Sequence, residues 1–373
     1  MSALAGLRVL DLSRLLPGGF CSLLLADFGA DVIKVEDMGA GDYLRADEPA
    51  FVALNRGKRS IRIDLKSAEG RAVFVRLARD ADVVLESFRP GVMDRLGVGY
   101  ERLHEINPGL IYCAISGYGQ DGPYALRAGH DMNYLALTGL LGMTGAPDGP
   151  PVQAAGQIAD VGGGALMAAF GILAALRERD ASGEGQFVDV SMTDGALSWL
   201  AMDAGRCLAG GAPPQRGQAP LAGGLICYRP YRCADGWVTL GALEPKFWRA
   251  WCEGVGRPEL VERQFDAVGS ETHREVEAVF ATRTRAEWEA FNDEHDCCLE
   301  PVLGLDEALS SELFRAREMV VDGGLGTPVK LSRTPGDPHR GAPAIGGDTD
   351  AVLTECGYGE GEIGALRAGG AIG

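Results

Sequence analysis

Residues 7–36 constrain the fold of this chain most, because strand, helix and strand signals follow one another there. Residues 7–12 are strand-like, a Pro-Gly-Gly turn at 16–19 precedes a helical run over 20–28, and residues 30–36 form a second strand-like segment. This order predicts a βαβ unit with parallel strands and a right-handed crossover. The turn does not match G-x-G-x-x-G, and no G-x-x-x-x-G-K-[ST] occurs, so dinucleotide and nucleoside triphosphate sites lack sequence support.

Later segments extend this pattern and predict an α/β protein with two domains. Strands are expected at 60–65, 81–86 and 110–116, with a helix over 68–78, which predicts a Rossmann-like parallel sheet in the large domain. A hairpin over 228–243, followed by helical segments, predicts a smaller α+β domain. We expect this division: large domain 1–208, linker 209–224, small domain 225–320, and a return to the large domain over 321–373.

The net negative charge of the chain limits the classes of partner that it is expected to bind. Its 35 basic and 52 acidic residues give a net charge of −17, which argues against nucleic acid and anionic membrane surfaces. No window of about 18 uninterrupted apolar residues and no signal-peptide pattern occur, so we expect no membrane span and a cytoplasmic location. The nine cysteines are scattered without a C-x-x-C pair, which favours free thiols over a disulfide framework or a metal site.

Basic residues gather beside the ends of the expected strands. An open parallel sheet binds ligands at the carboxyl ends of its strands, and guanidinium groups suit phosphates. The sequence therefore predicts an anion site that draws on Arg56, Lys58, Arg59, Lys66, Arg89 and Arg95.

His130 and Asp160 each lie where a loop is expected to feed a helix. Asp160 has the residue type of a helix N-cap, and the Gly162–Gly164 turn after it would let another molecule approach the backbone. An imidazole and a carboxylate that converge on one carbon can remove a proton from it and return one. Taken alone, each residue is more often structural, His130 as a histidine bonded within the fold and Asp160 as a simple helix cap, so neither carries a functional claim by itself.

Several motifs are recognisable as a set. The chain resembles the family III CoA-transferases over nearly its whole length, and residues 128–137 resemble the α-methylacyl-CoA racemase branch of that superfamily. The matching motifs cover residues 7–13, 25–36, 56–60, 88–97, 116–123, 185–189 and 241–245.

This resemblance implies an acyl-CoA substrate and a pair of acid/base residues, His130 and Asp160, with Glu244 near the histidine. It implies no permanently bound cofactor and no metal, because coenzyme A enters as part of the substrate. It also implies a homodimer of two interlocked subunits. The residues that it places along the coenzyme A site are Ile63, Asp64, Leu65, Lys66, Ser87, Phe88, Arg89, Arg95, Gly129, Asp131, Met132, Asn133 and Tyr134.

The chain departs from the racemase pattern at two places. Asp37 stands where racemases often carry an arginine that contacts the nucleotide, and residues 221–224 replace a more usual Asp-Gly-Gly. The first departure argues against that local contact with the nucleotide. The second segment is expected to touch the acyl chain, so it bears on which substrate is bound.

Three functions remain open from the sequence. The first is racemisation, in which Asp160 and His130 exchange protons with an α carbon while N–H groups at 161–164 hold the enolate oxygen. The second is CoA transfer, in which Asp160 attacks the acyl-CoA and later carries coenzyme A as a thioester. The third is a non-catalytic acyl-CoA-binding protein, against which the presence of both His130 and Asp160 argues.

Overall fold

The computed structural model describes residues 2–373 and divides them into two compact units. The sheet unit contains the chain up to Thr138 together with Ala154–Trp199 and Arg315–Gly373. The small unit contains Gly139–Gln153 and Leu200–Phe314.

This division differs from the expected domain boundaries. Residues 209–224, expected to be a linker, lie inside the small unit, where the Gly217 N–H donates to the carbonyl oxygen of Met143 and Arg216 donates to that of Gly142. These contacts tie the expected linker to residues 139–153, which the sequence assigns to the large domain.

Six strands form the centre of the sheet unit in the order β3-β2-β1-β4-β5-β6. Every neighbouring pair is parallel, which confirms the predicted parallel sheet. The order reverses between β1 and β4, and such a reversal opens a crevice at the carboxyl edge of a sheet. The bounds are β1 Arg8–Asp11, β2 Asp31–Glu36, β3 Arg59–Arg62, β4 Val83–Glu86, β5 Ile111–Ser116 and β6 Phe187–Ser191.

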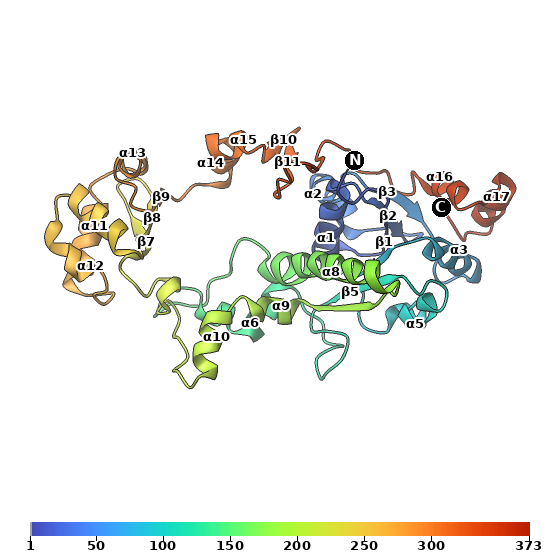
Figure 1. The fold of residues 1–373 in the computed structure, drawn as a ribbon, viewed down its shortest axis with the longest axis horizontal. Helices are drawn as coiled ribbons and strands as arrows, with labels where there is room; N and C mark the ends of the chain where they lie inside the picture. The colour runs from blue at the N-terminus through green and yellow to red at the C-terminus, as the bar shows by residue number, and fades with distance from the viewer. Residues whose placement is uncertain (1) are drawn as a thin grey trace. The chain divides into compact units, whose positions relative to one another are not determined.

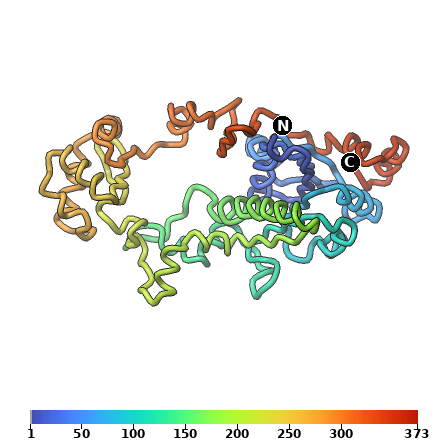
Figure 2. Tube along the Cα trace, in the orientation of Figure 1, coloured from blue at the N-terminus to red at the C-terminus, as the bar shows by residue number. Residues whose placement is uncertain are grey.

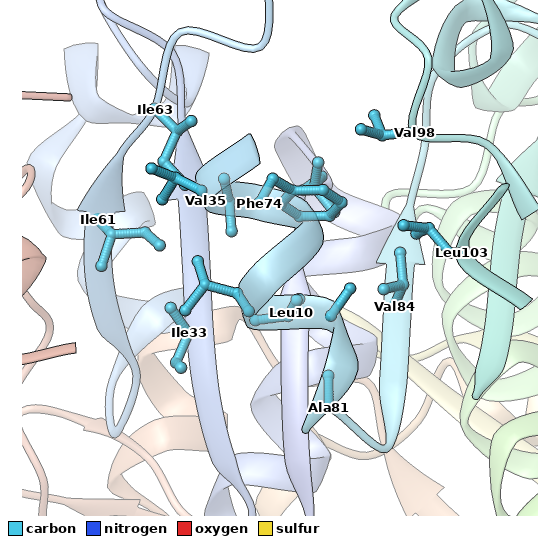
Figure 3. Close-up of a cluster of buried hydrophobic side chains, with 14 of the residues drawn as sticks. Leu10, Ile33, Val35, Ile61, Ile63, Phe74, Ala81, Val84, Val98 and Leu103 are labelled. Carbon is cyan, nitrogen blue, oxygen red and sulfur yellow. The ribbon is translucent and has the colours of Figure 1, made fainter. Parts of the chain in front are cut away.

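Helices cover both faces of this sheet (Figure 1). Those of the sheet unit are α1 Leu15–Asp27, η1 Tyr43–Ala46, α2 Glu48–Asn55, α3 Ala68–Arg79, α4 Val92–Arg95, α5 Tyr100–His104, α6 Asp131–Thr138, the π-helical η2 Ile158–Ala165, α8 Leu166–Ser182, α9 Met192–Ser198, α16 Thr349–Glu355 and α17 Glu360–Ala368. Helices α1 and α8 contact the strands on one face. On the other face Leu10, Ile33 and Ile61 of the strands pack with Phe74 of α3 and Leu103 of α5 (Figure 3).

The end of the described chain returns to this sheet. Figure 2 shows the red C-terminal segment beside the blue N-terminal strands. Ile372 forms an antiparallel bridge with Ile63, and the Asp64 N–H donates to the carbonyl oxygen of Ala371 at 2.9 Å. Val352 and Leu353 of α16 join the hydrophobic core below β3. Residues 371–373 therefore complete the carboxyl end of β3.

The first helix begins earlier than the sequence predicts. The expected turn at 16–19 is the first turn of α1, which starts at Leu15. Proline is tolerated in a first helical turn because its missing N–H would have no partner there. Gly18 lets this turn pack on the end of β1, since a Cβ atom at Gly18 would lie 2.1 Å from Cβ of Ser13.

The Gly162–Gly164 segment is also not a turn. It lies inside η2, which runs directly into α8. Its glycines allow close packing within the protein: a Cβ atom at Gly162 would meet the Trp199 ring at 2.2 Å, and one at Gly163 would meet the Met192 carbonyl oxygen at 2.5 Å. The predicted approach of another molecule to these glycines is therefore wrong, because α9 and Trp199 occupy that space.

The joined helix Ile158–Ser182 is long and apolar enough to cross a membrane, judged by length and composition. Asp160 and the glycines interrupt its apolar run, so the sequence predicts no span there. Half of its most apolar window is buried within the protein, where η2 packs against α1 and α9. These contacts favour a core helix of the sheet unit.

The small unit has a three-stranded antiparallel sheet, in the order β7-β8-β9, with helices packed on it. The predicted hairpin is confirmed by the pairing of β7 with β8. Its core gathers large aromatic side chains, including Trp248, Trp251, Phe280 and Trp288. The elements are α7 Leu140–Met143, α10 Ala201–Leu208, η3 Pro220–Ala222, β7 Tyr228–Arg232, β8 Trp237–Gly241, α11 Pro245–Gly254, η4 Pro258–Arg263, α12 Glu271–Phe280, α13 Arg285–His295, β9 Leu299–Pro301 and α14 Leu305–Ser310.

A short segment links the units again. Helix α15, Glu312–Ala316, crosses the boundary between them, and the hairpin of β10, Val320–Val321, with β11, Gly324–Leu325, follows in the sheet unit.

We predict that Gly163→Ala destabilises the protein by about 1–3 kcal/mol, because the added methyl group has only backbone atoms of α9 to displace. Gly364→Ala is the matched control: it lies inside α17 with open space around its Cβ position. Alanine there should stabilise by about 0.5–1 kcal/mol. Urea unfolding of both variants measures the difference, and equal effects would contradict the packing account.

Candidate functional site

A cleft of about 320 Å³ lies at the carboxyl edge of the sheet, and we call it the first cleft. His130 and Asp160 both line it, together with Ser87, Phe88 and Arg89. Its remaining lining residues are Arg14, Leu15, Pro17, Pro90, Ile115, Ser116, Gly117, Ala125, Arg127, Ala128, Gly129, Tyr134 and Met192. The two residues predicted to act as an acid/base pair therefore share one cavity.

His130 is held by its backbone at the start of α6. Its N–H donates to the Asn133 side-chain oxygen at 3.0 Å, and its carbonyl oxygen accepts from the N–H groups of Asn133 and Tyr134. These three bonds fix the backbone of His130 as the residue before the helix. The imidazole is exposed, and no hydrogen bond joins it to another side chain among residues 2–373.

Asp160 is half-buried in the first turn of η2 and is not the N-cap that the sequence predicts. Asp131 provides the cap instead: its Oδ1 accepts from the N–H groups of Ala159 at 2.6 Å and Asp160 at 3.0 Å. Asp131 is 4% exposed and comes from the start of α6. Since the cap is supplied by another helix, the Asp160 carboxylate remains free to face the cleft.

Burial, followed by the negative charge of Asp131, raises the pKa of Asp160 to about 6, while His130 acts in the opposite direction. A carboxyl group with this pKa is largely ionised at neutral pH and is a stronger base than an ordinary aspartate. Burial, followed by the charge of Asp160, raises the pKa of Tyr134 to about 12, so its phenol stays neutral. Its hydroxyl donates to the carbonyl oxygen of Gly129 at 2.6 Å.

The predicted enolate-binding N–H groups at 161–164 are not available. The Val161 N–H donates to the carbonyl oxygen of Gln157 at 2.9 Å, and Gly162–Gly164 lie within the hydrogen-bonded π-helix. The first N–H groups of a helix lack intrahelical partners. In α6 these belong to Asp131 and Met132, and neither has a backbone acceptor within the described chain.

A second cleft of about 510 Å³ lies over the carboxyl ends of β1, β2 and β3. The predicted residues Ile63, Asp64, Leu65 and Lys66 line it. Its other lining residues are Leu12, Arg14, Val35, Glu36, Asp37, Met38, Gly39, Phe88, Val92 and Leu96. Arg14 and Phe88 line both clefts, and the Arg14 guanidinium lies 5.6 Å from the centre of the Phe88 ring. The two clefts therefore meet at this pair.

The remaining predicted residues lie outside both clefts. Arg95, Asp131, Met132 and Asn133 line neither, although Asp131 and Asn133 fix the backbone next to the first cleft. Glu244 belongs to the small unit, where it is exposed and precedes α11 without capping it. Its proposed action on His130 stays a prediction.

Three of the six basic residues predicted to bind an anion form ion pairs within the protein instead. Arg56 pairs with Asp27 at 2.7 Å, Lys58 with Asp11 at 3.4 Å and Arg59 with Asp31 at 2.6 Å. Arg56 and Lys58 precede β3 and Arg59 is its first residue, so all three belong to the amino end of this strand and not to its carboxyl end, where ligands bind. Lys66 and Arg89 follow their strands and line the clefts.

Arg14 and Arg127 are functional candidates that the sequence analysis does not identify. Arg14 follows β1 and bridges both clefts, and its guanidinium pairs with Asp37 at 2.6 Å. The strand-end rule applied to Lys66 and Arg89 would have found Arg14. Arg127 lies in a loop, with its guanidinium 3.4 Å from the centre of the Tyr124 ring, and no sequence signal marks it.

Comparison with known proteins gives a consistent result. The CoA-transferase family III model matches residues 4–349. An alpha-methylacyl-CoA racemase of Mus musculus is 40% identical over 371 residues, which cover 96% of this chain and 95% of the mouse protein. A succinyl-CoA:mesaconate CoA-transferase of Haloarcula hispanica is 35% identical and is covered to 98%, with 97% of this chain aligned.

Solved structures agree with these relatives. A CAIB/BAIF family protein from Brucella suis superposes with a TM-score of 0.84 and is 31% identical, with 95% of this chain and 99% of that protein covered.

We predict that Asp131→Asn lowers the pKa of Asp160. Asparagine keeps a side-chain oxygen for the two N–H groups of η2 but removes the negative charge that helps to raise this pKa. A carbon-13 NMR titration of the Asp160 carboxyl group measures the change. Asp121→Asn, in an exposed loop, is the control and should leave the titration where it is. An unchanged titration in both variants would mean that Asp131 does not act on Asp160 through charge.

Proposed function

Because the chain belongs to CoA-transferase family III, a superfamily of enzymes, we propose that it racemises 2-methylacyl-CoA thioesters at the α carbon. One observation carries the proposal: the His130 imidazole and the Asp160 carboxylate line one cleft, and neither is used by the protein's own hydrogen bonds within the described chain. A structural histidine or a helix-capping aspartate would be engaged by its surroundings.

The reaction needs a base and an acid on opposite faces of the α carbon. Asp160, with its pKa raised to about 6, takes the α proton, and the electron pair moves onto the thioester oxygen. His130 then delivers a proton to the other face, and the pair moves back to carbon. For the opposite enantiomer the two residues exchange roles, so no atom is gained or lost.

The enolate oxygen requires hydrogen-bond donors. We assign this role to the N–H groups of Asp131 and Met132, which have no backbone acceptor within the described chain and lie at the positive end of the α6 dipole. Neither residue lines the first cleft, so the oxygen would have to reach them beside His130, which does line it. These N–H groups replace the 161–164 segment in the scheme. His130 directly precedes them, so the hydrogen bonds that hold the backbone of His130 would position both the acid and the oxygen-binding N–H groups.

The second cleft suits the coenzyme A part of the substrate. It joins the first cleft at Arg14 and Phe88, and its apolar walls, including Ile63, Leu65 and Val92, suit a flat purine base. Binding of remote parts of a substrate can lower the barrier at the reacting carbon. We infer that the nucleotide of coenzyme A occupies the second cleft and its thioester the first.

CoA transfer is the second candidate, because the same unpaired carboxylate can act as a nucleophile and transferases are among the relatives. Asp160 would then form an anhydride with the acyl group and later a thioester with coenzyme A. The free imidazole of His130 in the cleft favours racemisation, because CoA transfer through Asp160 does not require an imidazole.

A homodimer is part of the proposal. Leu166, Phe170 and Leu173 are exposed on α8 at the spacing of one helix face, and Phe170 is 72% exposed. An apolar stripe of this kind suits a second copy of the chain. We also propose that the protein is cytoplasmic. In the same scheme, Glu244 orients the His130 imidazole.

We predict that the protein exchanges the α proton of one enantiomer of a 2-methylacyl-CoA for deuterium in deuterium oxide without any acceptor acid, and inverts the centre. His130→Ala and Asp160→Asn should each slow the exchange by about 10²–10⁴-fold, because each removes one acid/base group. Mass spectrometry of the acyl group and chiral chromatography measure both events.

Asp180→Asn, on the exposed end of α8, is the control and should behave as the wild type. No exchange, combined with transfer of coenzyme A once a free carboxylic acid is added, would replace racemisation with the transferase reaction.

We further predict an acid limb in the pH profile of this exchange. A protonated Asp160 cannot accept a proton, so kcat/KM should fall about tenfold for each pH unit below about 6. The limb should move to lower pH in Asp131→Asn, because that substitution removes a charge that raises the pKa of Asp160. Stopped exchange assays between pH 4.5 and 8 measure it, and a rate independent of pH over this range would exclude Asp160 as the base.

A further inference from the structure

Asp37 is the first residue after β2, and its side chain lines the second cleft. Its Oδ1 accepts from the N–H groups of Gly39 at 2.8 Å and Gly41 at 3.2 Å. Its Oδ2 pairs with Nη2 of Arg14 at 2.6 Å. The carboxylate is therefore held in one place at the wall of the cleft, with 45% of its side chain exposed.

This carboxylate is ionised. Burial pushes its pKa upward, but the N–H groups of Gly39 and Gly41, together with Arg14, outweigh burial and lower the pKa. The charge is thus present at any pH where the enzyme would act.

The charged residues that line the second cleft leave little free positive charge for phosphate groups. Two basic residues, Arg14 and Lys66, line it against three acidic ones, Glu36, Asp37 and Asp64. Arg14 is already paired with Asp37. An adenosine carrying two backbone phosphates and a third phosphate on its ribose would meet one unpaired cation in this lining, Lys66.

Two further guanidinium groups near this wall are also engaged. Arg45 pairs with Glu36 at 2.5 Å, and Arg62 donates to the carbonyl oxygens of Asp37, at 3.2 Å, and of Met38. Both therefore hold the loop after β2 in place and leave no free charge for a ribose phosphate.

In sheets with this strand order, an acidic residue at the end of the second strand hydrogen-bonds the ribose hydroxyls of a bound nucleotide. Where the ribose carries a phosphate, a basic residue takes that place. Asp37 occupies this position in a sheet of the order β3-β2-β1-β4-β5-β6. Oδ1 of Asp37 already accepts two N–H groups, so Oδ2, which pairs with Arg14, is the oxygen that can accept a ribose hydroxyl, and its negative charge repels a phosphate dianion.

We propose that Asp37 binds a ribose with both hydroxyls free, so that the enzyme takes thioesters of 3′-dephospho-coenzyme A at least as well as those of coenzyme A. The inference rests on the proposed function, because it places the nucleotide in the second cleft. It adds a residue that determines specificity for the coenzyme A part of the substrate, at one of the two places where this chain departs from the racemase pattern.

The test compares two probes, coenzyme A and 3′-dephospho-coenzyme A, by titration calorimetry on the full chain. In the wild type the Kd for coenzyme A should equal or exceed the Kd for the dephospho form. Asp37→Arg should shift the ratio at least fivefold towards coenzyme A, because it replaces repulsion by attraction and leaves Arg14 unpaired. Asp37→Asn should shift it less, since it only releases Arg14. Asp121→Arg makes the same charge change in an exposed loop outside both clefts and should leave the ratio unchanged.

A wild type that prefers coenzyme A, or an Asp37→Arg ratio that changes less than fivefold, overturns the inference. Tight binding of both probes without deuterium exchange would contradict racemisation alone. Failure of both probes to bind would contradict the proposed function and this inference together.

Discussion

The hydrogen bonds from the N–H groups of Ala159 and Asp160 to Asp131 are the interaction on which the rest of the site depends. They join the start of α6 to the start of η2, although the two segments are about 30 residues apart in the chain. They satisfy helix-end donors that would otherwise be buried without partners. They also place a negative charge beside Asp160, which helps to raise its pKa towards neutrality. One side chain thus holds the backbone of the candidate catalytic carboxylate and adds to the effect of burial on its basicity.

Close packing at glycines also helps to fix the position of η2, the helix that carries Asp160. The carbonyl oxygen of Gly163 would lie 2.1 Å from a Cβ atom at Gly195, so both helices need a glycine where they cross. This contact brings η2 against α9 and leaves no room for a ligand on that side. Asp160, three residues earlier in η2, lines the first cleft.

The sequence predicts the parallel sheet well because each buried strand is a short apolar run bounded by turn residues, as residues 81–86 and 110–116 show. It also brings His130 and Asp160 together through the resemblance to a known family. It fails at Gly18 and Gly162, where residues typical of turns lie inside helices because neighbouring segments require small side chains there.

The cap by Asp131 and the junction formed by Arg14 and Phe88 depend on contacts between distant segments, which no local pattern contains. The exclusion of Arg56, Lys58 and Arg59 from the anion site has the same origin. Each has an acidic partner far away in sequence or buried in the core.

The bridge between Ile63 and Ile372 has a consequence for biosynthesis. The floor of the second cleft includes Ile63 and Asp64, and Asp64 is bonded to Ala371. A nascent chain can build the first strands early, but it cannot close this floor until residue 372 has left the ribosome. The N-terminal strands alone therefore cannot complete this edge of the second cleft, because it needs the pairing of residues 63–64 with residues 371–372.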